Sequence, residues 1–185
     1  GGTMKRLIAA AALGLFALLA QATELGISAK GAYEKVKQPN AKVLFLDVRD
    51  PVEIMFVGFT DLVHANIPYL IVDRTTWDDR RGNYKPNYNP NFVADVKAEL
   101  AKRGWGEDTE IITMCRSGSE RGQPSAEYLR DNGLLNARYV VNGFQGSVIK
   151  EGPQAGFRLQ NGWQNSGLPW SNKMNKDKMY GWTNK

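Results

Sequence analysis

Two short apolar runs, residues 43–46 and 109–114, limit the folds open to this chain of 185 residues. Residues 43–46 (Val-Leu-Phe-Leu) show no polar alternation, which is typical of a strand buried on both faces. Residues 109–114 are rich in β-branched side chains and predict a second strand. Helical patterns at 28–37, 92–102 and 123–132 alternate with the strands. This order predicts an α/β domain, with a central, mostly parallel sheet covered by helices in three layers.

The sequence outside these elements indicates where the domain ends and where an insertion and a C-terminal arm begin. Further strands are expected at 63–69 and 138–141, and a polar loop or insertion rich in Asn, Pro, Gly and Arg at 77–90. From residue 150 onward the periodicity fades, but the segment holds many aromatic and apolar residues. We therefore expect the domain to span residues 23–149. Residues 150–185 are expected to form an irregular aromatic C-terminal arm that packs on the domain or on a partner.

The first 22 residues have the features of a targeting segment. Residues 1–3 precede Met4 and are expected to be an expression remnant. Met4 is followed by Lys5-Arg6, an apolar run at 7–20 and the small residues of Ala20-Gln21-Ala22. This pattern predicts a cleaved secretory signal peptide, and the run is short for a membrane-spanning helix. The protein is thus expected to be periplasmic or otherwise exported, with membrane contact only through the signal peptide.

The charge of the chain narrows the class of partner. Removing the predicted signal peptide removes two basic residues and no acidic one, so the formal charge falls by two, from +5 to +3. That excess is enough to steer a small anion. The sequence has no dense Lys/Arg stripe with interleaved aromatic residues, so no nucleic-acid partner is expected.

Cysteine and histidine each occur once, as Cys115 and His64. A lone thiol in an exported protein cannot form an internal disulfide, so it is a liability, an intermolecular link or a reactive group. The same count excludes a thiolate zinc cage and covalent haem, so we expect no metal and no cofactor. His64 is placed near a strand start, away from the carboxyl edge of the sheet, and is not expected to act as the catalytic base.

Cys115 directly follows the strand at 109–114, at the edge where α/β sheets bind ligands. The residues after it lead into a helix, whose N–H groups and dipole favour a thiolate and can cradle an oxyanion. Two arginines add positive charge, which is expected to lower the pKa of the thiol. The alternative is a buried strand-end cysteine before an ordinary turn. The candidate nucleophile is Cys115, and the candidate substrate-binding residues are Arg116, Ser117, Gly118, Ser119, Glu120 and Arg121.

Four segments between residues 28 and 146, taken in order, resemble the rhodanese homology domain. They are Asp47-Val48-Arg49 with Glu53, Asn66-Ile67-Pro68, Cys115-Arg116-Ser117-Gly118, and Val141-Asn142-Gly143-Phe144-Gln145-Gly146. The resemblance implies a rhodanese-like domain and a single-domain exported sulfurtransferase. Its cysteine would take sulfane sulfur from thiosulfate, polysulfide or a persulfide, and the Cys115 persulfide would pass it to a thiophilic acceptor. The expected partners are a small sulfur-containing anion and a periplasmic acceptor protein.

Two further residues are expected to support the loop. Asp47 either places a carboxylate near the loop, bonding its backbone or Arg121, or simply starts a turn after the strand. Arg49 is expected to form a structural pair with Glu53 on the first helical turn. Arg74, Arg80 and Arg81 of the polar insertion either rim the pocket mouth or form a solvated surface.

The loop departs from the rhodanese pattern at one position. Rhodaneses commonly space their cysteine and arginine as C-x-x-G-x-R, but Glu120 occupies the sixth place here and Arg121 follows, giving C-x5-R. That spacing resembles dual-specificity cell-cycle phosphatases and fungal-type arsenate reductases, which remain an alternative. Met114 stands before Cys115, where those phosphatases commonly have a histidine. A non-catalytic periplasmic sulfur carrier is a third hypothesis. Glu120 itself either faces solvent or repels anionic substrates.

Overall fold

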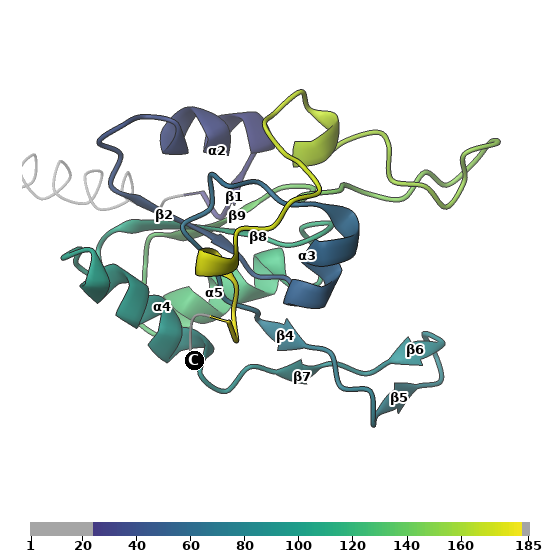
Figure 1. The fold of residues 1–185 in the computed structure, drawn as a ribbon, viewed down its shortest axis with the longest axis horizontal. Helices are drawn as coiled ribbons and strands as arrows, with labels where there is room; N and C mark the ends of the chain where they lie inside the picture. The colour runs from purple at the N-terminus through teal and green to yellow at the C-terminus, as the bar shows by residue number, and fades with distance from the viewer. Residues whose placement is uncertain (1–23, 183–185) are drawn as a thin grey trace, which may run out of the picture.

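The computed structural model describes residues 24–182, and its centre is a five-stranded sheet (Figure 1). All neighbouring strands of this sheet pair in parallel. In spatial order they are β1 (Gly26–Ile27), β9 (Ala137–Val140), β8 (Glu110–Met114), β2 (Val43–Asp47) and β3 (Ala65–Asn66). The predicted α/β class with a parallel sheet is confirmed. The predicted signal peptide lies outside the described residues.

The two apolar runs form the neighbouring central strands β2 and β8. Leu44 pairs with Ile111, and Phe45 pairs with Ile112. Successive side chains of a strand point to opposite faces, so these four buried residues fill the core on both sides of the sheet. The uninterrupted apolar character of residues 43–46 follows directly from this two-sided burial.

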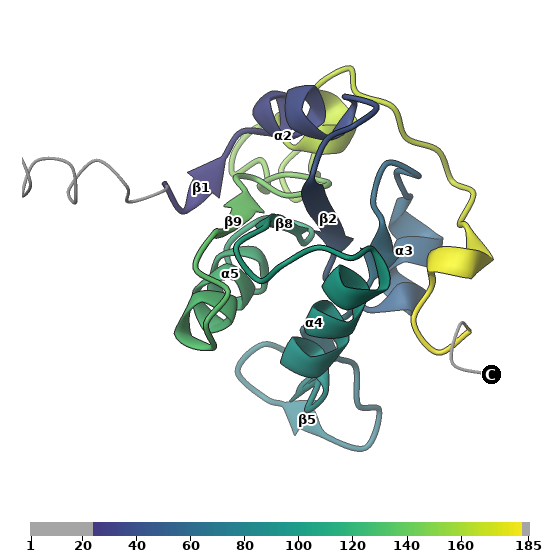
Figure 2. The same cartoon turned by 90° about the vertical axis from the view of Figure 1, so that its left-hand side faces the viewer.

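Helices cover both faces and complete three layers (Figure 2). On one face, α4 (Phe92–Lys102) and α5 (Gly122–Asp131) bury their apolar stripes against β2 and β8. On the other face, α2 (Ala29–Val36) and α3 (Pro51–Val57) do the same. α3 begins at a proline, and the Asp50 carboxylate caps it by accepting from the Val52 N–H at 2.9 Å.

The polar insertion is a narrow antiparallel ribbon rather than a plain loop. We call it the 70–88 ribbon. β4 (Leu70–Ile71) pairs with β7 (Asn87–Tyr88), and β5 (Trp77–Asp78) pairs with β6 (Asn83–Tyr84). The expected strand at 63–69 reduces to the two residues of β3, although Ile67 N and Tyr69 N still donate to the Asp47 and Val48 carbonyls at 2.9 and 3.1 Å. In Figure 1 the ribbon projects away from the sheet.

The C-terminal residues leave the sheet as an extended excursion, the 147–162 loop, and then return over the α2/α3 face. Trp163, in the short 3-10 helix η1 (Trp163–Asn165), is fully buried, and its ring centroid lies 5.4 Å from that of Phe45. Ser171 and Phe59 then exchange two backbone hydrogen bonds, of 2.8 and 2.9 Å. A second 3-10 helix, η2 (Lys176–Lys178), follows. Within residues 24–182 no helix combines the length and apolar character needed to cross a membrane.

Candidate active site

Cys115 lies at the carboxyl edge of the sheet, directly after β8, and is fully buried. We call residues 115–121 the cysteine loop. Its first peptide groups are tied to the segment after β9. The Cys115 carbonyl accepts from Phe144 N at 2.7 Å, and the Arg116 carbonyl accepts from Gln145 N and Gly146 N at 2.9 and 3.0 Å. The segment that resembles the closing rhodanese motif therefore anchors the loop.

The cysteine sulfur is surrounded by the backbone of the loop and of α5. Gly118 donates its N–H to Cys115 Sγ at 3.1 Å. Gly118 has φ +89°, and a Cβ there would lie 2.9 Å from Asn142 N, so the position requires glycine. α5 begins beside the sulfur, because a Cβ on its first residue, Gly122, would lie 3.3 Å from Sγ. A helix N-terminus and an N–H donor thus both favour negative charge on this sulfur.

The outer part of the cysteine loop offers further donors. Within the described part of the chain, the backbone N–H groups of Arg116, Ser117, Ser119, Glu120 and Arg121 donate to no protein acceptor. The Ser117 and Ser119 hydroxyls lie 3.1 Å apart. Unpaired N–H groups in a curled loop are the donors that bind an oxyanion. The sequence-predicted substrate-binding residues are therefore brought together around one short loop.

Arg121 is clamped to α3 by Glu53. Its Nη2 donates to Glu53 Oε1 at 2.8 Å, and its Nη1 donates to Oε2. Burial by itself raises the pKa of Glu53, but hydrogen bonds and charge from Arg121, with Arg49 and Arg116 farther off, hold that pKa below its ordinary value. Burial acts to lower the pKa of Arg121, but Glu53 outweighs it and the pKa is raised. Both groups are thus charged at neutral pH.

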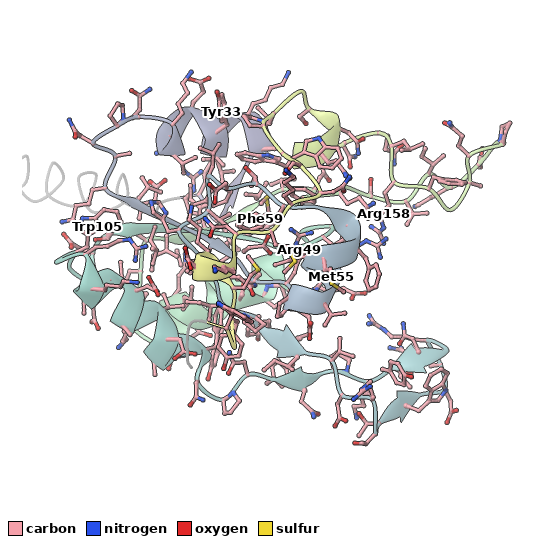
Figure 3. All side chains as sticks on the ribbon, in the orientation of Figure 1. Tyr33, Arg49, Met55, Phe59, Trp105 and Arg158 are labelled. Atoms are coloured by element: carbon pink, nitrogen blue, oxygen red, sulfur yellow. The ribbon has the colours of Figure 1, made fainter. Side chains whose placement is uncertain are left out.

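The expected pair between Arg49 and Glu53 is wrong. Arg49 instead binds Asp47, with Nε to Oδ1 at 2.9 Å and Nη2 to Oδ2 at 2.6 Å, and both side chains are buried. Arg49 comes from the turn that leads into α3 (Figure 3), and its guanidinium also lies over the ring of Phe144, 4.3 Å from the centroid. Arg49 therefore braces the segment that anchors the cysteine loop. Glu53 is left to reach Arg121.

The extra loop residue, Glu120, is paired with the 70–88 ribbon. Arg81 donates Nη2 to Glu120 Oε1 at 2.6 Å and Nη1 to Oε2 at 3.2 Å. Both side chains are substantially exposed. Sequence reasoning left open whether the ribbon arginines reach the pocket, and the structure shows that Arg81 does. No local sequence signal links residues 39 positions apart.

A pocket of about 580 Å³ opens over the cysteine loop. The 70–88 ribbon and the 147–162 loop, which extend to the same side of the domain in Figure 1, both contribute residues to its lining. Its lining residues are Glu53, Arg81, Asn83, Arg116, Ser117, Ser119, Glu120, Arg121, Ser147, Val148 and Arg158. Cys115 is not among the lining residues and is fully buried, but the loop that carries it contributes five of them.

His64 lies elsewhere. Its Nδ1 accepts from the backbone N–H of Phe45 at 2.9 Å, and its ring packs against Trp105. Burial lowers its pKa. It lines a separate hollow between α4 and the C-terminal residues, with Asp95 and Tyr180. The histidine therefore serves the packing of that region.

Comparison with solved structures places the chain among known α/β proteins. The crystal structure of Rv0390 from M. tuberculosis matches with 29% sequence identity and a TM-score of 0.56, over 80% of this chain and 97% of that one. A rhodanese-related protein from Thermoplasma volcanium matches with 21% identity and a TM-score of 0.45, over 81% of this chain and all of the other. No family model matches the sequence, and neither does any curated protein.

The likeness to Rv0390 covers nearly the whole of that protein, so the two chains share their architecture. The central sheet, the two helical layers and the loop after β8 stand where the four sequence motifs place them. The chain therefore has a three-layer α/β fold with a central parallel sheet, which it shares with Rv0390, and four segments of its sequence resemble the rhodanese homology domain.

Proposed function

We propose that the protein is a sulfurtransferase of the rhodanese type, with Cys115 as the nucleophile. The observation that carries the proposal is the setting of the sulfur. It follows a central strand, accepts an N–H from Gly118 at 3.1 Å and lies against the start of α5, and the loop that carries it lines an arginine-rich pocket. These groups stabilise a thiolate and, after transfer, a persulfide anion.

The transfer proceeds in two balanced steps. The thiol proton leaves to solvent, and the Cys115 thiolate attacks the sulfane sulfur of a donor such as thiosulfate. A bond forms between Sγ and that sulfur, the donor's S–S bond breaks, and sulfite departs with its electron pair. A thiophilic acceptor then attacks the outer sulfur of the persulfide and restores the thiolate. Neither step needs a metal, a redox cofactor or a general acid.

The C-x5-R spacing of the longer loop favours one alternative function, that of a thiolate phosphatase or arsenate reductase. An aryl or alkyl phosphate leaving group needs a proton from an acid near the pocket. Two carboxyl groups line the pocket, and an arginine pairs with each. Arg121 holds the pKa of Glu53 low, so Glu53 is ionised and cannot donate, and Glu120 is engaged by Arg81. Sulfite leaves as an anion and has no such need. The protonation state of Glu53 therefore supports sulfur transfer.

The proposal also covers the location of the protein and its sulfur acceptor. We propose that the mature protein is exported and passes its sulfur to a periplasmic acceptor protein. A carrier without turnover would use the same persulfide but release its sulfur slowly to small acceptors. Release to cyanide separates the two, because an enzyme yields thiocyanate repeatedly and a carrier does so at most once per exposure to donor.

The test uses the full chain and its Cys115→Ser variant. Each is exposed to thiosulfate or polysulfide and its intact mass is measured, then cyanide is added and thiocyanate is followed. One added sulfur atom on the wild type alone, with repeated thiocyanate release, is expected. No added sulfur with any donor would overturn the proposal. Cys115-dependent phosphate release from an aryl phosphate, abolished by deleting Glu120, would establish the alternative function instead.

A further inference from the structure

The pocket above the cysteine loop is larger than an inorganic sulfur donor requires. Its volume of about 580 Å³ lies within the roughly 300–1,000 Å³ typical of sites for organic ligands. Thiosulfate needs only the sulfur and the loop donors around it. Ser147, Val148 and Arg158 of the 147–162 loop also line this space.

The pocket also carries positive charge that the protein does not neutralise. Four arginines and two glutamates line it. Glu53 pairs with Arg121, and Glu120 pairs with Arg81. Among residues 24–182, Arg116 and Arg158 form no ion pair, which leaves a net charge of two positive units on the lining.

Arg116 and Arg158 act on each other across this space. Burial lowers the pKa of Arg116, and the positive charge of Arg158 lowers it further. Two half-buried guanidinium groups that repel each other are unfavourable in the empty pocket. An anion placed between them removes that repulsion and gains charge-assisted hydrogen bonds.

Within residues 24–182, each of these arginine side chains donates one hydrogen bond to the protein. Arg116 Nε donates to Gln145 Oε1 at 2.7 Å, and Arg158 Nη1 donates to the Gly146 carbonyl at 2.6 Å. A guanidinium has five N–H donors, so most of them stay available to a ligand. The base of the 147–162 loop is itself fixed, because Asn161 Oδ1 accepts from Ser147 N at 2.8 Å. The two groups are therefore oriented before any ligand arrives.

We propose that Arg116 and Arg158 form a second anion subsite, which binds the carboxylates of an acidic organic persulfide while its sulfur faces the cysteine loop. The inference rests on the proposed sulfurtransferase function and narrows its substrate class. The donor is a small organic molecule with two negative charges, rather than an inorganic anion alone. Arg158 comes from the residues after the four rhodanese-like segments, so the specificity belongs to this chain's own extension.

The experiment compares three donors: the persulfide of mercaptosuccinate, which carries two carboxylates, the persulfide of 2-mercaptoethanol, which is neutral, and thiosulfate. The proteins are the wild type, Arg158→Gln, Arg158→Lys and Lys150→Gln. Lys150 is an exposed cation of the same 147–162 loop that does not line the pocket, so its variant is the matched control. Loss of about tenfold in kcat/KM is expected for Arg158→Gln with the acidic persulfide alone. Arg158→Lys recovers part of that loss, and Lys150→Gln is unchanged.

Equal losses with all three donors, or no loss, would overturn the subsite while leaving sulfur transfer in place. If no donor loads Cys115, the proposed function fails, and a binding measurement then decides the subsite alone. Calorimetry with (methylthio)succinate, an unreactive dianion, is run on the Cys115→Ser protein with and without Arg158→Gln. Weaker binding in the double variant supports the subsite, and equal binding or none refutes it.

Discussion

The guanidinium of Arg121 and the carboxylate of Glu53 meet in a two-point ion pair, although the residues lie 68 positions apart. Arg121 ends the cysteine loop and Glu53 lies in the first turn of α3. The pair therefore joins the end of the cysteine loop to α3. Its side chains are only 15% and 19% exposed, so each charge depends on the other for compensation.

Replacing Glu53 by glutamine should destabilise the domain and loosen the loop. Arg121 would remain largely buried without a counter-charge, which predicts a loss of about 2–3 kcal/mol in urea unfolding. Sulfur uptake by Cys115, followed by intact mass, should slow. The control is Glu99→Gln, because Glu99 pairs with Arg103 at comparable exposure but on α4. A control that slows uptake equally would contradict the assigned role of Glu53.

The same pair predicts a pH dependence of stability. The folded-state pKa of Glu53 lies below its ordinary value of 4.5. The stabilisation is therefore fully present above that value and is lost as the pH falls through the lower folded-state pKa. In urea unfolding, the difference between wild type and Glu53→Gln should be constant above about pH 5.5 and shrink below about pH 4.5. A difference that stays constant into stronger acid would exclude this linkage.

Gly118 and Gly133 offer a matched test of the loop backbone, with φ of +89° and +91°. A Cβ at Gly133 meets nothing within 4 Å, whereas one at Gly118 approaches backbone atoms of the segment that anchors the loop. Gly133→Ala should cost only the conformational strain, about 1–2 kcal/mol. Gly118→Ala should cost more and should also abolish persulfide formation, since it displaces the N–H donor to Sγ. Equal behaviour of the two variants in unfolding and in sulfur uptake would argue against the loop geometry.

Sequence periodicity and turn residues predicted those elements whose position depends mainly on neighbouring residues in the chain. The bounds of α4 agree with the 92–102 pattern, and Cys115 stands at the end of β8 because a buried strand must end before a Gly- and Ser-rich turn. Asn91 stands at the N-cap position of α4, but its side chain makes no cap hydrogen bond, and Asn89 Oδ1 accepts from the Asn91 N–H instead. Such caps depend on the approach of the preceding chain, which periodicity does not describe.

Sequence patterns could not predict which distant residues pair with the side chains of the site. Arg49 pairs with Asp47 rather than with Glu53, and its guanidinium is also stacked on Phe144 and donates to the Gly58 carbonyl at 3.0 Å. The pairing of Arg81 with Glu120 depends on how a ribbon folds back over the pocket. β1 has only two residues and no periodic signal of its own; it exists because β9 supplies its hydrogen-bond partners.

Charge at the mouth of the pocket gives a further prediction. Glu120→Gln removes a negative charge and frees Arg81, so uptake from thiosulfate should speed up, most of all at low salt. Arg81→Gln should slow uptake, because it leaves Glu120 uncompensated. Both side chains are exposed, so stability in urea should hardly change. Kinetics over a range of salt concentrations test this, and identical rates for the two variants would refute it.

The C-terminal residue Trp163 is expected to contribute to the stability of the core. Trp163→Ala removes a fully buried side chain that contacts Phe45 and Tyr33, which predicts a loss of about 3–5 kcal/mol in the free energy of unfolding. Trp182, which is 51% exposed, is the control, and Trp182→Ala should cost about 1 kcal/mol or less. Urea denaturation measures both. Similar losses for the two variants would show that the return of the chain contributes little to the core.

The pairing of β1 with β9, and the burial of Trp163 on the α2/α3 face, have a consequence for biosynthesis. The sheet edge is completed by residues 137–140, and the core beneath α2 is filled only by a side chain still later in the chain. Domains fold as units during synthesis, and contacts between distant residues are slow to form. A nascent chain on the ribosome therefore cannot close this domain until nearly all of it has emerged. A truncated product that ends before Trp163 would present an open apolar face to chaperones and proteases.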